Sequence, residues 1–239
     1  MSKYHIHPLT SIIREVNNIF SGMGFTFAEG PEIETEYYNF DALNVPKDHP
    51  ARDMQDTFFV DSKNEKVLRT HTSPVQIHYM ENHEPPIRVI VPGKAYRNEA
   101  TDMTHEAQFH QVEGLVVGDD ITLAHMKGVL KQFFEKFFKG SVEIRLRPGF
   151  FPFVEPGAEV DMRLVGENVP EKLRGKWIEM LGSGMVHPNV LKSAGIDPDK
   201  YQGWAFGMGL ERLGMLKYGI DDVRAFSDGD LRFIEQFSV

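Results

Sequence analysis

The chain has 239 residues, of which 41% are apolar and none is cysteine, and it carries a formal net charge of −9. This length and composition predict one large domain with a substantial core, and the lack of cysteine excludes disulfides, thiolate metal sites and a cysteine nucleophile. The acidic balance argues against a protein that holds nucleic acid through a basic field of its own.

The amino-terminal segment predicts a cytoplasmic location and then a helix. Residues 1–5 lack the apolar run of a signal peptide, and no window approaches roughly 18 uninterrupted apolar residues, so we expect no membrane span. Pro8 suits a first helical position, and the apolar residues after it recur with the helical period until Gly22. These apolar residues are Leu9, Ile12, Ile13, Val16, Ile19 and Phe20.

The remaining elements follow from periodicity and from turn residues. Residues 41–56 are polar and aperiodic, which predicts a long loop, and loops of that length are often functional. Thr122 as N-cap and Gly140 as terminator bound a second helix, and a third runs from near Leu210 to Gly219. The predicted strands are residues 87–91, 112–117 and 142–147, and a hairpin loop is predicted over residues 166–176.

The order of these elements predicts an α+β fold. Helices and strands do not alternate as regular βαβ units, which argues against a doubly wound parallel sheet. Residues 142–147 alternate between apolar and charged positions, a pattern that suits an antiparallel sheet with one exposed face. We expect a single domain over residues 1–239.

Three stretches concentrate residues suited to holding a polyphosphate beside a flat base. The stretch 94–114 contains Arg97 and Glu99, 151–157 is rich in phenylalanine, and 203–212 is glycine-rich and ends at Arg212. A charged pair in a loop is usually only solvated, so each stretch alone would carry little information. Their combination is what indicates a functional site.

In this order the three stretches resemble the catalytic core of the phenylalanyl-tRNA synthetase alpha subunits, a family of class II aminoacyl-tRNA synthetases. Residues 24–31 resemble motif 1 of the class, 97–113 motif 2 and 203–212 motif 3. Further strings that resemble this family in particular lie at 47–52, 71–74, 109–114 and 184–188. The resemblance implies the class II catalytic fold, a central antiparallel sheet flanked by helices. Alpha subunits of the family carry an N-terminal coiled-coil arm for tRNA, and we expect this sequence to depart from them in lacking that arm and to hold no editing domain.

The resemblance implies that the chain activates phenylalanine with ATP and transfers it from phenylalanyl-adenylate to the 3′-terminal ribose of tRNA(Phe). Such chemistry depends on positioning and on fixed positive charge where negative charge develops. Arg97 would form paired bonds to the α-phosphate and the attacking carboxylate. The other implied contacts to ATP come from Arg212 stacked on adenine, Phe109 on the opposite face, Glu99 at the adenine amino group and His105 near the phosphates.

Arg97, Arg212 and His105 are thus the implied catalytic residues. For Phe109 the plain alternative is core packing, although its polar neighbours weaken that reading. For His105 the alternative is an exposed or capping histidine.

The resemblance also implies a pocket for the phenylalanine side chain and ammonium group. Phe151 and Phe153 are expected to alternate on one face of a strand, so that both rings meet the edge of the substrate ring. Ordinary strand core is the alternative for this pair. The complete implied set is His71, Ser73, Gln111 and Glu113 at the ammonium group, with Phe151, Phe153, Val154, Ala205 and Gly207 around the ring.

A divalent cation, Mg²⁺, is expected because the charge of a polyphosphate must be neutralised. Glu155 is the best candidate ligand, whereas Glu159 and Asp161 are weaker candidates that suit structural or solvated roles. The sequence after His105 lacks the second histidine of an HExxH site, so we set a catalytic zinc aside.

The implied partners are phenylalanine, tRNA(Phe) and a beta subunit in an alpha2beta2 assembly. Motif 1 implies an interface, and residues 9–52 are expected to pair with that subunit or with a second alpha chain. An apolar pocket disfavours tyrosine, which carries one extra hydroxyl group, by only about a hundredfold. Mis-activated tyrosine therefore requires proofreading, which the resemblance places in the beta subunit. The rival interpretations are a catalytically inactive paralogue and a stand-alone ligase that passes an adenylated acid to a small amine.

Overall fold

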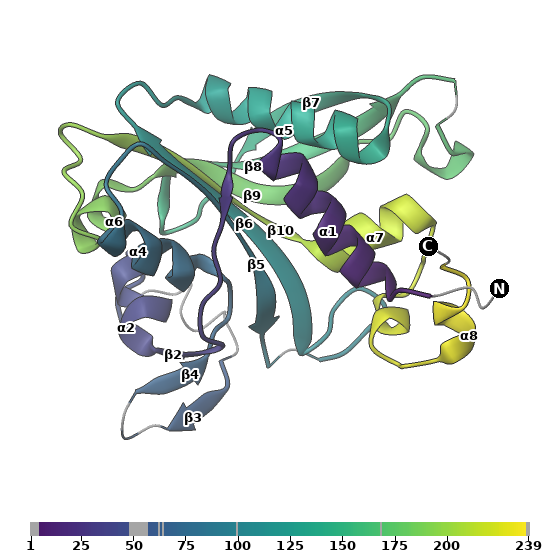
Figure 1. The fold of residues 1–239 in the computed structure, drawn as a ribbon, viewed down its shortest axis with the longest axis horizontal. Coiled ribbons are helices and arrows are strands. Elements are labelled where there is room, and N and C mark those ends of the chain that lie inside the picture. The colour runs from purple at the N-terminus through teal and green to yellow at the C-terminus, as the bar shows by residue number, and fades with distance from the viewer. Residues whose placement is uncertain are drawn as a thin grey trace.

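The fold is built on one large sheet that the chain assembles out of sequence order (Figure 1). The computed structural model describes residues 5–47, 57–61, 63, 65–98, 100–167 and 169–237. Only the short β1 runs parallel to its neighbour, β5, and the other pairs are antiparallel. The seven strands in spatial order are β1 (Thr26–Phe27), β5 (Ile87–Tyr96), β6 (Gln108–Gly118), β10 (Gln202–Gly209), β9 (Ile178–Val186), β8 (Val154–Val165) and β7 (Ser141–Pro148).

Three helices cover one face of this sheet, namely α1 (Pro8–Ser21), α5 (Leu123–Phe138) and α7 (Leu210–Tyr218) (Figure 1). The Thr122 side chain accepts a hydrogen bond from the His125 amide and so caps the start of α5. Phenylalanines of α1 and α5 meet in the core, where the rings of Phe20 and Phe133 stack with centroids 4.7 Å apart. The three predicted helices are therefore confirmed.

The apolar stripe of α1 is part of this core, which corrects its expected role at a subunit interface. Leu9, Ile12, Val16 and Phe20 are buried inside the chain, packed with residues of α5 and α7. A stripe whose apolar area is already removed from water has little left to gain from a partner. The apolar side chains exposed near motif 1 are instead Phe27, Ile33 and Tyr37.

Shorter elements lie on the opposite face, and they form a second apolar cluster with β5 and β6. A small antiparallel sheet follows motif 1, with the strand order β2, β4, β3. The bounds are α2 (Glu36–Asn39), η1 (Asp41–Leu43), α4 (Ser73–Asn82), α6 (Pro188–Ser193), β2 (Ile33–Thr35), β3 (Phe59–Asp61) and β4 (Lys66–Leu68).

The chain ends in η3 (Val223–Phe226) and α8 (Leu231–Ile234), which bring the carboxyl-terminal segment back to the amino-terminal one (Figure 1). The His5 ring nitrogen Nδ1 lies 3.0 Å from the Phe237 carbonyl oxygen, and the His7 Nε2 lies 3.0 Å from that of Phe226. None of the helices in the described part of the chain is long and apolar enough to span a bilayer.

The α+β prediction and the three predicted strands are confirmed, although each strand is longer than expected. The predicted loop 41–56 begins with the helical turn η1, in which Ala42 and Leu43 are buried, and its residues 48–56 lie outside the described residues. The predicted hairpin loop 166–176 joins neighbouring antiparallel strands and contains the turn η2 (Glu171–Leu173). The expectation of a single domain stays a prediction.

Candidate active site

A cavity of about 930 Å³ runs along the strands from α4 to the first turn of α7. Small residues make room for it on the sheet. A side chain at Gly207 would come within 2.8 Å of the Gln111 amide nitrogen, and one at Gly182 within 2.7 Å of the Phe151 ring. Gly207 pairs with Glu113 on one side and with Gly182 on the other, so these positions lie next to one another across the strands.

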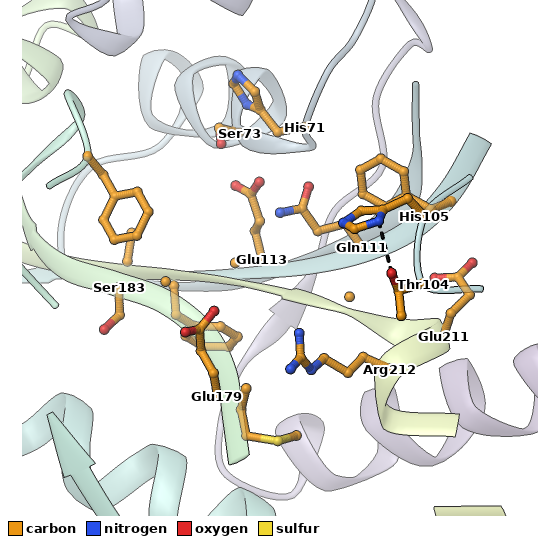
Figure 2. Close-up of a pocket in the computed structure, with 18 of the residues that line it drawn as sticks. His71, Ser73, Thr104, His105, Gln111, Glu113, Glu179, Ser183, Glu211 and Arg212 are labelled. Atoms are coloured by element: carbon orange, nitrogen blue, oxygen red, sulfur yellow. Dashed lines mark hydrogen bonds between the residues drawn. The ribbon is translucent and has the colours of Figure 1, made fainter. Parts of the chain in front are cut away.

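One end of the cavity holds the buried carboxylate of Glu113, which points toward α4 (Figure 2). The Gln76 side-chain amide donates a hydrogen bond of 2.7 Å to it. Burial raises the pKa of Glu113 to about 7, although hydrogen bonds from Ser73 and Thr72 and the charge of Arg69 oppose that rise. The site therefore keeps a carboxylate that ionises near neutral pH and can receive a cationic group.

His71 lies above Glu113 at the start of α4 (Figure 2). Its side chain is buried, and neither ring nitrogen forms a well-aligned hydrogen bond with a described residue, although the Asn39 backbone lies near enough to favour the protonated ring. Burial, followed by the charge of Arg97, lowers the pKa of His71 to about 3, so the ring is neutral at physiological pH. An unpaired buried polar group is costly, which indicates that a ligand is meant to pair with it.

Phe151 and Phe153 form an aromatic wall beside this polar end. Their rings stack with centroids 6.0 Å apart, and the Phe153 ring lies 6.2 Å from that of His71. The expectation that the two phenylalanines alternate on a strand is wrong, because β7 ends at Pro148 and β8 begins only at Val154. Pro152 lies between the two phenylalanines and lacks the amide hydrogen that a ladder needs, and residues 152–153 form a turn before β8.

The other end of the cavity carries the two arginines. The Arg97 Nε donates to the Thr70 carbonyl at 3.2 Å, and its guanidinium carbon lies 5.0 Å from the centroid of the Phe109 ring. Arg212 extends from the first turn of α7 toward the same space (Figure 2). The sandwich of a base between Phe109 and Arg212 stays a prediction, and Glu99 lies outside the described residues.

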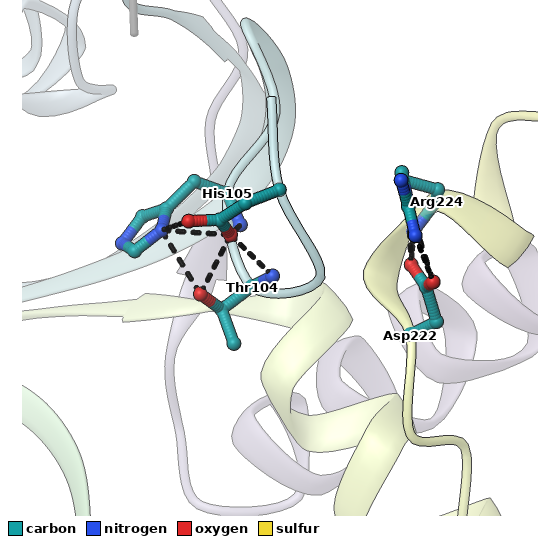
Figure 3. A network of polar contacts seen from close by, with 5 residues as sticks. Thr104, His105, Asp222 and Arg224 are labelled. Carbon is teal, nitrogen blue, oxygen red and sulfur yellow. Dashed lines mark hydrogen bonds and ion pairs between the residues drawn. The ribbon is translucent and has the colours of Figure 1, made fainter. Parts of the chain in front are cut away.

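His105 lies at the mouth of the cavity in a tight polar turn (Figure 3). The carboxylate of Asp102 accepts hydrogen bonds from the backbone amides of Thr104 and His105. Hydrogen bonds from Thr104, and then from His105, hold the pKa of Asp102 well below its usual range. Backbone pairing of Met103 with Val223 fastens this turn to the carboxyl-terminal segment.

The candidate metal ligand Glu155 does not line the cavity. Its side chain is 76% exposed, and its carboxylate lies 3.3 Å from the His187 Nε2. Asp161 is buried and paired with Arg145 and Arg147, as suits a structural residue. In the described ranges, no three histidine or carboxylate side chains gather to hold a metal ion.

The structure brings the nine residues of the implied phenylalanine pocket together on one cavity, together with Arg97, His105, Phe109 and Arg212. It also adds residues that the sequence did not single out. Glu179 from β9 points into the cavity near Ser183 (Figure 2). Gln76 reaches the cavity from α4. Glu211 accepts hydrogen bonds from the amide and the ring of His110 and so fixes the motif 3 helix to motif 2.

Those additional residues lack a distinctive local signal. A glutamine in a helix or a glutamate in a strand is common on any surface, and only the fold shows which of them face the cavity. Glu211 could have been found, because it is part of the motif 3 stretch and stands beside Arg212.

Comparison with known proteins agrees with this geometry. The family model for the tRNA synthetases class II core domain (F) matches residues 1–237. Phenylalanine–tRNA ligase alpha subunits from Caldanaerobacter subterraneus, Syntrophomonas wolfei and Bacillus subtilis are 54%, 57% and 56% identical to this chain. The alignments cover 98%, 97% and 97% of the chain and 69%, 68% and 68% of those relatives, respectively.

A solved structure shares the fold at much lower sequence identity. The crystal structure of pyrrolysyl-tRNA synthetase from Desulfitobacterium hafniense aligns with a TM-score of 0.69 and 18% identity. The match covers 92% of this chain and 73% of that protein. This likeness concerns the arrangement of the elements alone.

Proposed function

The chain belongs to the family of phenylalanine–tRNA ligase alpha subunits, within the class II synthetases, and we propose that it activates phenylalanine with ATP. The product would be phenylalanyl-adenylate, with release of pyrophosphate. The phenylalanyl group would then pass to the 3′-terminal ribose of tRNA(Phe).

The observation that carries this proposal is the different chemical character of the two ends of this cavity. A buried carboxylate and an unpaired neutral histidine lie at one end beside two aromatic rings, and two arginines lie toward the other. An amino acid with an aromatic side chain fits the first end, with its ammonium group at Glu113. Its carboxylate would then point along the strands toward Arg97, where an anionic nucleotide can meet it.

In this reaction the oxygen of the amino acid carboxylate forms a bond to the α-phosphorus of ATP, and the bond to the pyrophosphate oxygen breaks. Arg97 would stabilise the charge that develops on the α-phosphate, because a planar guanidinium can bind two oxygens at once. Its Nε bond to Thr70 fixes the guanidinium before substrates arrive, so little reorganisation is needed. Arg212 would hold the base and the terminal phosphate.

We propose that a Mg²⁺ ion, bound together with the nucleotide, would supply positive charge beside the phosphates. Mg²⁺ usually keeps several waters and takes only one or two protein carboxylates. Glu155, the ligand suggested by the sequence, lies on the surface beside His187 and outside the lining of the cavity, which argues against its direct contact with a nucleotide bound there. The cation would neutralise part of the polyphosphate charge, whereas the arginines would stabilise the charge that develops at phosphorus.

The partner proposals follow from the names of the relatives and from the exposed surface near motif 1. We propose that a beta subunit binds there in an alpha2beta2 assembly, where Phe27, Ile33 and Tyr37 expose apolar surface. The net charge of −9 favours a partner that supplies most contacts to tRNA phosphates, since such contacts dominate nucleic-acid affinity. Self-association of two alpha chains is the alternative for the same surface.

A stable sulfamoyl analogue of phenylalanyl-adenylate tests the assignment of the cavity. Calorimetric titration should show tight binding of the phenylalanyl analogue and weaker binding of the isoleucyl analogue. Phe153→Ala should weaken the phenylalanyl analogue, whereas Phe59→Ala, which removes an exposed ring of the small sheet, should not. Equal affinity for both analogues would contradict the assignment.

A further inference from the structure

Arg69 is a buried arginine that lies next to the proposed ammonium site without being part of the cavity wall. Its side chain is 3% exposed. The Nε donates to the Lys94 carbonyl at 2.7 Å, and Nη1 donates to the carbonyls of Gly30 and Pro31 at 3.1 and 3.2 Å. One guanidinium thus ties the end of motif 1 to strand β5.

The remaining nitrogen, Nη2, lies over β5. It stands where a side chain at Gly93 would project, so this position tolerates no Cβ without displacing the arginine. Gly93 pairs across the ladder with Gln111, and Val91, two residues earlier, pairs with Glu113. The guanidinium therefore lies on the face of the sheet from which Gln111 and Glu113 project.

Few side chains in the described part of the chain stabilise the ionised form of Glu113. Among the described residues, Ser73 and Gln76 from α4 act on its carboxylate, as do Arg69 and Thr72 from the segment before that helix. The ring of His71, in the same segment, lies above Glu113 and is neutral (Figure 2). Of the four residues that act on the carboxylate Arg69 is the charged one, and β10 places Gly207 directly across the ladder from Glu113. Arg69 in turn interacts with Glu32, Glu34 and Tyr96 as well as with Glu113.

We propose that Arg69 is a positioning residue for the amino acid ammonium site, where it braces motif 1 against β5 and supplies buried positive charge that favours the ionised form of Glu113. The inference rests on the proposed function in one respect, namely that Glu113 receives the substrate ammonium. The brace and the charge are separable. Lysine keeps the charge but loses the fork of donors, whereas glutamine loses both, so the difference between the two variants reports the effect of the charge.

The effect of Arg69 on the ionisation of Glu113 can be measured without an activity assay. Carbon-13 NMR titration of carboxyl-labelled glutamates, with Glu113→Gln for assignment, reports the ionisation of Glu113 in the 239-residue chain. The midpoint should lie near pH 7 in the wild type. It should rise by about one pH unit or more in Arg69→Gln, which removes a close positive charge.

Two further variants complete the comparison. Arg69→Lys should leave the midpoint closer to the wild type than Arg69→Gln does, while lowering thermal stability. Arg88→Gln, which removes an exposed arginine of β5, should leave the midpoint of Glu113 unchanged. If Arg69→Gln does not fold, Gly93→Ala provides the test, because the added methyl group displaces the guanidinium and should raise the midpoint.

Activity then links the charge to substrate binding. The pH profile of kcat/KM for phenylalanine reports groups of the free enzyme. In Arg69→Gln its acidic limb should move to higher pH by the same interval as the NMR midpoint, with kcat/KM recovering at high pH. An unchanged NMR midpoint in Arg69→Gln or Gly93→Ala would overturn the inference. A shifted midpoint in a chain without phenylalanine-dependent activity would instead count against the proposed function alone.

Discussion

Replacing Glu113 by glutamine should make the ligand-free protein more stable at alkaline pH while abolishing amino acid binding. Glu113 has a folded-state pKa of about 7 against an ordinary value of 4.5, because burial disfavours its charge. The native state therefore holds the proton more tightly than the unfolded chain does. Stability from this group is complete below pH 4.5 and is lost as the pH rises through 7.

The magnitude follows from the interval between the two pKa values. At 1.36 kcal/mol per pH unit, ionising Glu113 in the folded protein costs about 3 kcal/mol at pH 8. At pH 5 the cost is below about 1 kcal/mol. The neutral amide keeps an oxygen for the Gln76 donor and never ionises, so the stability advantage of Glu113→Gln should grow by about 2.5 kcal/mol between pH 5 and pH 8.

Urea unfolding of both proteins at several pH values measures this difference. Glu179→Gln, which removes an exposed carboxylate in the same cavity, is the matched control and should show no comparable growth with pH. Calorimetry should find that Glu113→Gln no longer binds phenylalanine. A stability difference that stays constant from pH 5 to pH 8 would refute the reasoning that burial governs this carboxylate.

Three further substitutions test other parts of the site. Arg97→Lys should lower kcat about a hundredfold or more with a smaller change in KM, since the lost bidentate contact is worth roughly 3 to 4 kcal/mol in the transition state. Steady-state kinetics measures both constants, and a change in KM alone would contradict that role. Ala205→Gly should raise the exchange rate for para-chlorophenylalanine relative to phenylalanine if Ala205 forms the end wall. Gly182→Ala should raise KM for phenylalanine, because the methyl group would meet the Phe151 ring, and should leave ATP affinity unchanged in a binding titration.

Much of the helical layer could be predicted because its signals are local. Thr122 caps α5, and Gly219 ends α7 in the left-handed conformation that glycine adopts freely. Strands β9 and β10 gave weaker signals. Gly182, Gly184, Gly203 and Gly207 interrupt them, because bulky side chains at those positions would meet neighbouring strands or the side chains that line the cavity.

The functional residues could be predicted as a set, but their interactions could not. Sequence order places Gln111 and Glu113 on one strand face, yet nothing in it shows that α4 brings Gln76 to the Glu113 carboxylate. The protonation behaviour of Glu113 and His71 depends on burial, which only the folded chain determines. The interface role expected for the apolar stripe of α1 was wrong for the same reason. A helical apolar pattern indicates a buried face but does not show whether the chain itself or a partner covers it.

Amino-acid-dependent exchange of pyrophosphate into ATP tests the central claim most directly. The assay should be run with each natural amino acid, with Mg²⁺, and with and without a beta subunit. Phenylalanine should drive exchange far better than any other amino acid, and tyrosine should be disfavoured by only about a hundredfold. Equal rates with isoleucine or histidine, or no exchange with phenylalanine in the complete assembly, would contradict the assignment of this cavity.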